Sequence, residues 1–244
     1  MKTKKVSPLS ICMIVALVLI GKTLPCSAAQ LRAGFASRIV TPDPLLPVSG
    51  GVGPSHAVTN KIGDLTVRAL VLENGATRVA LCSVDFLGFP SALGDKVRAR
   101  VSAIPAANVL IGATHTHSAP DCYGFPDGKG GFASDLKYLD SVCERLAETI
   151  NSAAQTLQPV LLRAATGVAA RKIAYNAYAP ELYDPRCHVI QLLTPDEKPF
   201  VTLVNYAVHP EVLGPDAGVV SADLVAPLYE RIAAQGGGLG IFMN

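Results

Sequence analysis

The sequence has few charged residues and, beyond its N-terminal segment, no long apolar run. Charged residues make up 16% of the 244 residues and apolar residues 50%, with 21 glycines and 18 prolines. This balance excludes a disordered chain, a collagen-like fibre and a disulfide-rich miniprotein. The sequence also has no internal repeat and no linker-like stretch. We therefore expect a single globular domain.

Several signatures of catalysis and binding are also missing. The sequence contains no Gly-x-Ser-x-Gly elbow, no His-Glu-x-x-His helix and no Gly-x-x-x-x-Gly-Lys-Ser/Thr phosphate loop in the mature chain. It has no stripe of basic and aromatic residues of the kind that binds nucleic acid. We therefore expect no nucleic-acid partner.

The N-terminal segment has the three parts of a secretory signal peptide. Lysines near its start are followed by an apolar run over residues 11–20 and by small residues at 27–29. A run of about ten residues is too short to cross a hydrocarbon core of about 30 Å. We predict that residues 1–28 are a signal peptide and that residues 29–244 are exported, to the periplasm or outside the cell, without a transmembrane segment.

The leader also accounts for the positive charge of the chain. The formal net charge is +2, but residues 1–28 hold four of the 21 basic residues and none of the 19 acidic ones. The mature chain is thus slightly acidic, and its charge implies no anionic partner.

Four cysteines remain after the leader is removed: Cys82, Cys122, Cys143 and Cys187. Their spacing contains no Cys-x-x-Cys metal knuckle, and four cysteines permit three disulfide pairings in an oxidising compartment. One possibility is a bridge between Cys122 and Cys143 that fastens the loop after the histidines. The other is that Cys82 and Cys187 are buried free thiols on strands.

Periodicity predicts a mixture of strands and helices. Asn74-Gly75 between two apolar runs predicts a hairpin, and apolar spacing of three and four predicts a long amphipathic helix. The predicted strands cover residues 65–73, 78–84, 109–113, 160–166, 188–193, 200–208 and 239–244, and the predicted helices cover 92–104, 134–157 and 224–234. Because no strict strand-helix-strand rhythm appears, we expect one α/β domain built on a mixed β-sheet with flanking helices.

Histidine is scarce, with five residues in all, and three of them stand at the ends of apolar strands. His115 and His117 follow the strand 109–113, and His209 follows the strand 200–208. Alternation along an extended segment places residues two apart on one face, so His115 and His117 can reach one metal or one substrate group. Three neutral imidazoles suit zinc and leave an open position for water. The alternative is that these histidines only hydrogen-bond neighbouring backbone.

Two further polar positions have open interpretations. Ser221 and Asp223 precede a predicted helix, and from the local pattern alone they are best explained as an N-cap. Asp85 ends an apolar strand and is either a carboxylate in a cleft or a capped loop residue.

Three segments, taken together, resemble the neutral/alkaline (non-lysosomal) ceramidase family. Residues 113–120, Ala-Thr-His-Thr-His-Ser-Ala-Pro, are similar to the family's Ala-Thr-His-Thr-His-Ser-Gly-Pro signature. Residues 205–210, Asn-Tyr-Ala-Val-His-Pro, resemble its second histidine segment, and Val-Ser-Ala-Asp at 220–223 resembles its Ile-Ser-Gly-Asp segment. The order and spacing agree over nearly all of residues 29–244.

The resemblance implies a zinc amidohydrolase that cleaves the N-acyl bond of ceramide or a related N-acyl lipid. It assigns His115 and His209 as zinc ligands, with a Glu and a Tyr expected beyond Asn244. It places His117 against the substrate and Ser221 as nucleophile or substrate-positioning residue. Because the chain stops at the start of an apolar strand, we expect that the N-terminal catalytic domain continues past Asn244.

The sequence departs from the family pattern near the substrate side. Ala119 and Ala222 replace glycines, Asp121-Cys122 replaces Gly-Gly, and Leu-Val-Ala at 224–226 replaces Asn-Lys-Gly. The alternatives are therefore a non-catalytic exported binding module or an inactive fragment of a ceramidase-like hydrolase.

Overall fold

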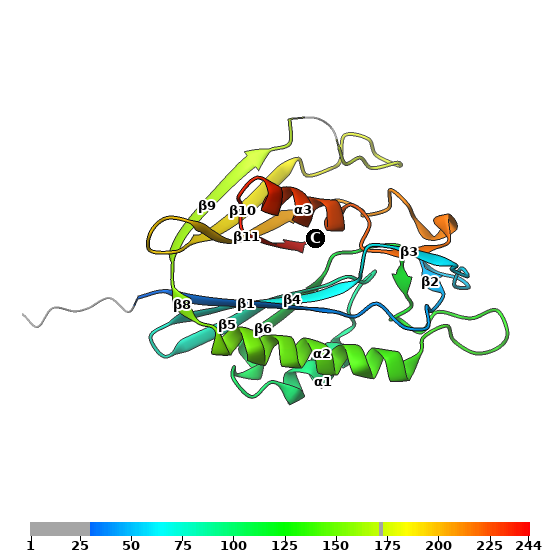
Figure 1. Cartoon of the computed structure of the whole chain (residues 1–244). Helices are drawn as coiled ribbons and strands as arrows, with labels where there is room; N and C mark the ends of the chain where they lie inside the picture. The colour runs from blue at the N-terminus through cyan, green and yellow to red at the C-terminus, as the bar shows by residue number, and fades with distance from the viewer. Residues whose placement is uncertain (1–29, 171–172) are drawn as a thin grey trace, which may run out of the picture.

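Figure 1 shows a computed structural model of the chain, which describes residues 30–170 and 173–244. The predicted signal peptide lies outside the described residues. The elements in chain order are β1 (Arg32–Ile39), β2 (Val48–Ser49), β3 (Asn60–Ile62), β4 (Thr66–Asn74), β5 (Thr77–Val84), α1 (Ser91–Arg100), η1 (Ala106–Asn108), β6 (Val109–Ala113), β7 (Ala119–Pro120), α2 (Leu136–Gln155), β8 (Gln158–Pro159), β9 (Leu161–Val168), β10 (Arg186–Leu193), β11 (Pro199–Tyr206), η2 (Pro215–Ala217), β12 (Val219–Ser221), α3 (Val225–Ala234) and β13 (Leu239–Met243).

The strands form two main sheets. The first has the order β6-β5-β4-β1-β8 and the second the order β13-β11-β10-β9. The pairs β5–β6 and β11–β13 are parallel, and the other pairs in these sheets are antiparallel. The α/β class with mixed pairing and flanking helices is confirmed, while the strands are divided between two large sheets and two short ladders, β12–β3 and β2–β7.

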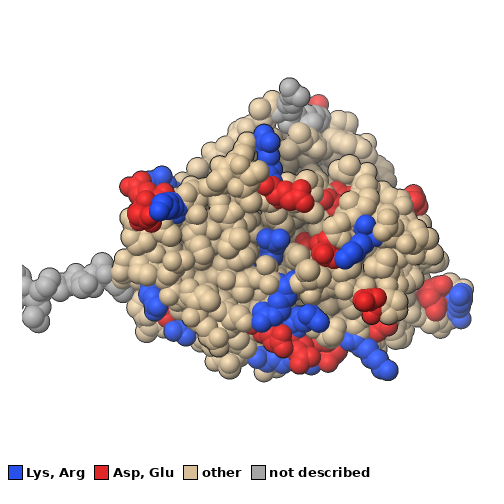
Figure 2. Space-filling model, viewed as in Figure 1, with Lys and Arg blue, Asp and Glu red and all other residues tan. Residues whose placement is uncertain are grey.

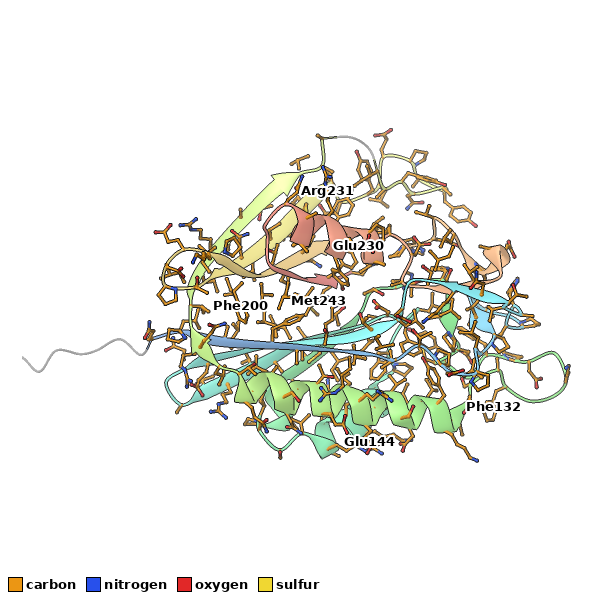
Figure 3. The ribbon with its side chains drawn as sticks, viewed as in Figure 1. Phe132, Glu144, Phe200, Glu230, Arg231 and Met243 are labelled. Atoms are coloured by element: carbon orange, nitrogen blue, oxygen red, sulfur yellow. The ribbon has the colours of Figure 1, made fainter. Side chains whose placement is uncertain are left out.

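The two sheets stack face to face, with helices outside them (Figure 1). Alternation along β4 shows how one strand serves two layers: Val71 packs in the core under α2, whereas Leu70 belongs to the core between the sheets. Phe200 and Met243 point into that inter-sheet space in Figure 3. On the far side of the second sheet, Phe242 packs with residues of α3. Burial of each such side chain contributes about 1.5–3 kcal/mol.

The hairpin predicted from Asn74-Gly75 is confirmed with one difference. Asn74 is the last strand residue and pairs with Thr77, so the two turn residues are Gly75 and Ala76. Gly75 has a φ of 59°, in the region that glycine adopts without strain.

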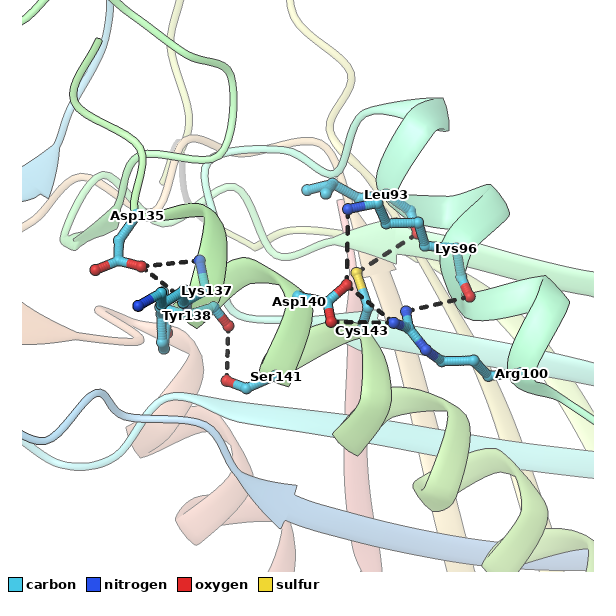
Figure 4. A network of polar contacts seen from close by, with 9 residues as sticks. All are labelled: Leu93, Lys96, Arg100, Asp135, Lys137, Tyr138, Asp140, Ser141 and Cys143. Carbon is cyan, nitrogen blue, oxygen red and sulfur yellow. Dashed lines mark hydrogen bonds and ion pairs between the residues drawn. The ribbon is translucent and has the colours of Figure 1, made fainter.

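Helix α2 confirms the amphipathic helix that the apolar spacing predicted. Asp135 caps it by accepting hydrogen bonds from the amides of Lys137 and Tyr138. Figure 4 shows its contact with α1, where Asp140 accepts from Arg100 at 2.9 Å. That pair is exposed and therefore contributes little to stability, and the packing of α2 on β1 and β4 holds the layer together.

The four cysteines are free, so of the two possibilities the Cys122–Cys143 bridge is not formed. The Cys122 thiol donates to the carbonyl of Gly88 at 3.2 Å, and the Cys143 thiol to that of Leu93. Both thiols are thus directed at the backbone beside α1. Cys82 is a buried free thiol on β5, as the second interpretation had it, and Cys187 on β10 is half-buried. Burial raises the pKa of Cys122 to about 12, which keeps its thiol protonated.

The surface carries charges of both signs. On the face drawn in Figure 2, lysines and arginines lie interspersed with aspartates and glutamates. Over residues 30–170 and 173–244, every helix is too short or too polar to cross a bilayer.

Candidate metal centre

The segment after β6 brings two histidines to the end of the first sheet. The amide of Thr114 donates to the carbonyl of Val84, and the amide of His115 donates to that of Phe86. His115 has a φ of 69°, a conformation that residues other than glycine adopt at a cost of about 1–3 kcal/mol. The segment is therefore not an extended strand, and simple alternation is the wrong explanation for how His115 and His117 converge. The left-handed backbone at His115 turns the chain there.

His209 reaches the same place from the second sheet. Strand β11 ends at Tyr206, two residues before the predicted end, and residues 207–210 are irregular. The amide of His117 donates to the carbonyl of Pro210 at 3.2 Å. One backbone hydrogen bond thus joins the two histidine segments.

The three imidazoles form one cluster. Their candidate ligand nitrogens lie within 4.8 Å of one another. The ring centroids are 4.5 Å apart for His115 and His209, 5.0 Å for His115 and His117, and 5.2 Å for His117 and His209. Such spacing is close enough for one ion to contact all three rings.

Backbone carbonyls fix two of the rings. Nδ1 of His115 lies 2.6 Å from the Leu87 carbonyl oxygen, and Nδ1 of His117 lies 2.8 Å from that of Gly50. A carbonyl only accepts, so each Nδ1 carries the hydrogen and a neutral ring keeps its lone pair on Nε2. Nε2 of His117 is buried and has no hydrogen-bond partner. This orphaned nitrogen has its lone pair available, either to a metal ion or to a proton from a bound group.

The surroundings favour neutral imidazole. Burial lowers the pKa of His115, and the neighbouring rings of His209 and His117 lower it further. A metal takes the neutral ring, and histidine nitrogens suit zinc, which in a catalytic site keeps one position open. The residues present therefore fit a zinc ion.

Glu211 is a member of the cluster that the sequence did not reveal. Its carboxylate oxygens lie 3.3 Å from Nδ1 of His117 and 3.8 Å from Nδ1 of His209. The sequence signal was weak, because a single glutamate two residues after a histidine in an irregular segment follows no recognised spacing.

Ser221 lies beside the histidine loop, residues 114–118, and its side chain is buried. Its hydroxyl donates to the Ile62 carbonyl at 2.9 Å and accepts from the Asp223 amide at 3.0 Å. Its amide donates to the carbonyl of Ser118, and Thr116 donates its hydroxyl to the carbonyl of Ser221. These bonds tie β12 to the histidine loop, and neither partner of the hydroxyl is a histidine.

The capping interpretation of Ser221 and Asp223 is wrong. Helix α3 begins at Val225, and its N-cap residue, Leu224, has no side-chain capping bond. The Asp223 carboxylate accepts from the Leu224 amide just before the helix, but also from the amides of Val212 and Leu213, at 3.1 and 2.8 Å. Asp223 therefore holds the segment that carries Glu211.

Asp85 and Asp121 are structural carboxylates. Asp85 is 1% exposed and accepts from both the amide and the hydroxyl of Thr66, so it is not a cleft residue. Burial raises its pKa. Asp121, which no sequence pattern marked as an anchor, accepts from the amides of residues 123–125 and from the Ser134 hydroxyl. It orders the start of the loop over residues 124–131, which contains four glycines.

Two solved structures share this fold. A structure described as a ceramidase complexed with C2 matches with a TM-score of 0.67 and 19% identity, over 88% of this chain and 37% of that one. A neutral ceramidase from Pseudomonas aeruginosa matches with a TM-score of 0.64 and 19% identity, over 88% of this chain and 38% of that one. The chain has a ceramidase-like fold.

The likeness is limited to architecture. The chain spans little more than a third of the length of each ceramidase, and at 19% identity the match establishes the fold alone. No protein-family model and no curated protein matches the chain.

Proposed function

We propose that the chain belongs to an exported zinc-dependent amidohydrolase that cleaves the N-acyl bond of ceramide or a related N-acyl lipid. The observation that carries the proposal is the cluster of His115, His117 and His209, with an orphaned buried nitrogen, at the ends of two sheets. The ceramidase-like fold supports the same chemistry.

His115 and His209 are the proposed zinc ligands. When bound there, zinc supplies Lewis-acid polarisation of the acyl carbonyl and activation of water at neutral pH. Hydrogen bonds from the His115 amide and ring to Phe86 and Leu87 hold that ligand in place before any metal arrives.

His117 is the proposed proton carrier. Its Nδ1 hydrogen is held by the Gly50 carbonyl, so Nε2 is free to accept a proton from an attacking water and return it to the leaving amine. Ser221 has a different proposed role, because a serine nucleophile needs an adjacent base and its hydroxyl is engaged by Ile62 and Asp223. Ser221 positions the loop that carries His117.

Turnover tests the proposal. The full-length gene product is assayed for hydrolysis of N-acyl sphingosine and of simpler N-acyl amides. We expect hydrolysis that chelation removes and zinc restores, and that His117→Ala lowers kcat by about 100-fold or more. Hydrolysis that is insensitive to chelation contradicts a zinc-dependent reaction.

A non-catalytic exported binding module, or a fragment inactive by itself, is the second candidate. The engaged hydroxyl of Ser221 and the buried Asp121, both near departures from the family pattern, favour it. Binding of an N-acyl lipid without any turnover distinguishes this candidate from an enzyme.

A further inference from the structure

We propose that Glu211 is a positioning residue that orients the imidazole of His209 toward the metal. The inference rests on the proposed zinc function. It concerns a carboxylate that the family resemblance does not assign.

The need for such a residue comes from His209. Its side chain is 66% exposed, and among the residues that the structure describes no hydrogen bond fixes its ring. By contrast, the side chain of His117 is 9% exposed and is held by the Gly50 carbonyl. Within the cluster, the group that faces Nδ1 of His209 is the Glu211 carboxylate, at 3.8 Å.

Glu211 is itself held in position. Its amide donates to the carbonyl of His209 at 2.9 Å, which folds the chain tightly after the histidine. The next two amides, of Val212 and Leu213, donate to the buried carboxylate of Asp223. The backbone on both sides of Glu211 is therefore fixed, and its side chain is directed to the Nδ1 side of both rings.

A carboxylate on the Nδ1 side of a histidine has a known effect on metal binding. It accepts the Nδ1 hydrogen, fixes the tautomer that leaves Nε2 free and makes Nε2 more basic. Loss of such a partner lowers metal affinity by about 10–100-fold. Glu211 lies on that side of the His209 ring, at 3.8 Å, so its removal weakens the site without removing a ligand.

Zinc affinity, measured by competition with a chromophoric chelator, tests the inference. We expect Glu211→Ala to bind zinc about 10–100-fold more weakly than the wild type, and Glu211→Gln, which keeps an acceptor but no charge, to lie between them. Glu230→Gln on the exposed face of α3 is the matched control and should bind like the wild type. Equal thermal unfolding of the metal-free proteins would show that the loss is local.

A second readout needs neither metal nor activity. Nitrogen-15 NMR of the histidine rings above pH 8 should show the Nδ1-protonated tautomer for His209 in the wild type and a shift to the Nε2-protonated form in Glu211→Ala. Zinc binding by the wild type with unchanged affinity and tautomer in Glu211→Ala overturns the positioning role alone. Absence of zinc binding by the wild type overturns both this role and the proposed function.

Discussion

The two segments that meet at the histidine cluster are built differently. In the segment after β6, His115 and His117 each have a backbone carbonyl on Nδ1, and the loop is pinned to the ends of neighbouring strands. In the segment after β11, His209 is exposed and its surroundings depend on two carboxylates, Glu211 and Asp223. Backbone carbonyls thus hold the rings of His115 and His117. The surroundings of His209 are instead formed by side chains, which single substitutions can remove.

Substitution of one histidine in each segment should affect zinc binding alike but the stability of the metal-free protein differently. His115→Ala and His209→Ala should both weaken zinc binding by more than about 100-fold, since each removes a ligand. Only His115→Ala should lower the free energy of unfolding of the metal-free protein, by about 1 kcal/mol, because it loses the Leu87 hydrogen bond. Chelator competition and urea unfolding measure the two quantities. Equal destabilisation by both substitutions would show that the two segments do not differ in this way.

Asp223→Ala should unfold the second segment locally. The substitution leaves the amides of Val212 and Leu213 without their acceptor, so we expect a loss of about 2–4 kcal/mol in the free energy of unfolding. Hydrogen exchange should accelerate at residues 211–213 and stay unchanged at 114–118. Faster exchange in both segments would show that they are one cooperative unit.

Ser221→Ala probes the first segment through the strand that supports it. Loss of the hydroxyl bonds to Ile62 and Asp223 should cost about 1–3 kcal/mol, while turnover, if the encoded protein is active, should fall by less than about tenfold. Unfolding curves and kcat are measured on the same preparation. A loss of turnover by several orders of magnitude with normal stability would instead make Ser221 the nucleophile.

Asp85→Asn gives the weakest effect, and one that depends on pH. Burial raises the pKa of Asp85, so the folded state holds its proton more tightly than the unfolded state does. The buried Asp85 carboxylate therefore destabilises the folded state only where it would ionise. This destabilisation is absent well below the unfolded pKa of about 4 and grows as pH rises through that value toward the folded pKa.

The side-chain amide introduced by Asp85→Asn carries no charge, so its burial costs less than the burial of an ionised carboxylate. We expect this variant to be more stable than the wild type at pH 8, by about 1 kcal/mol, with the difference vanishing toward pH 3.5. Thermal unfolding across this range checks the expectation. A variant less stable than the wild type at pH 8 would show that the carboxylate is ionised and stabilising.

Much of the fold was predictable because periodicity is a local property. The spacing of Leu139, Leu146 and Ile150 predicted α2, and Gly75 predicted the hairpin. The division into two sheets was not predictable, because an apolar strand such as β10 does not specify which strand will lie beside it. The free thiols likewise depend on distances between elements that sequence spacing does not contain.

The site was predictable in part. The resemblance and the strand ends pointed to His115, His117 and His209, and the structure brings these residues together. The left-handed backbone at His115 and the proximity of Glu211 were not predictable, because both depend on where loops from different sheets meet. The predicted roles of these residues, and of Ser221, remain predictions.

Whether the histidine cluster holds zinc decides the proposed chemistry, and X-ray absorption at the zinc edge measures this without reference to any substrate. For the zinc-loaded protein we expect one zinc per chain, with at least two imidazole nitrogens at about 2.0–2.1 Å, and the loss of an imidazole shell in His115→Ala. Zinc surrounded only by oxygen or sulfur, or an unchanged spectrum in His115→Ala, would contradict a zinc site at this cluster.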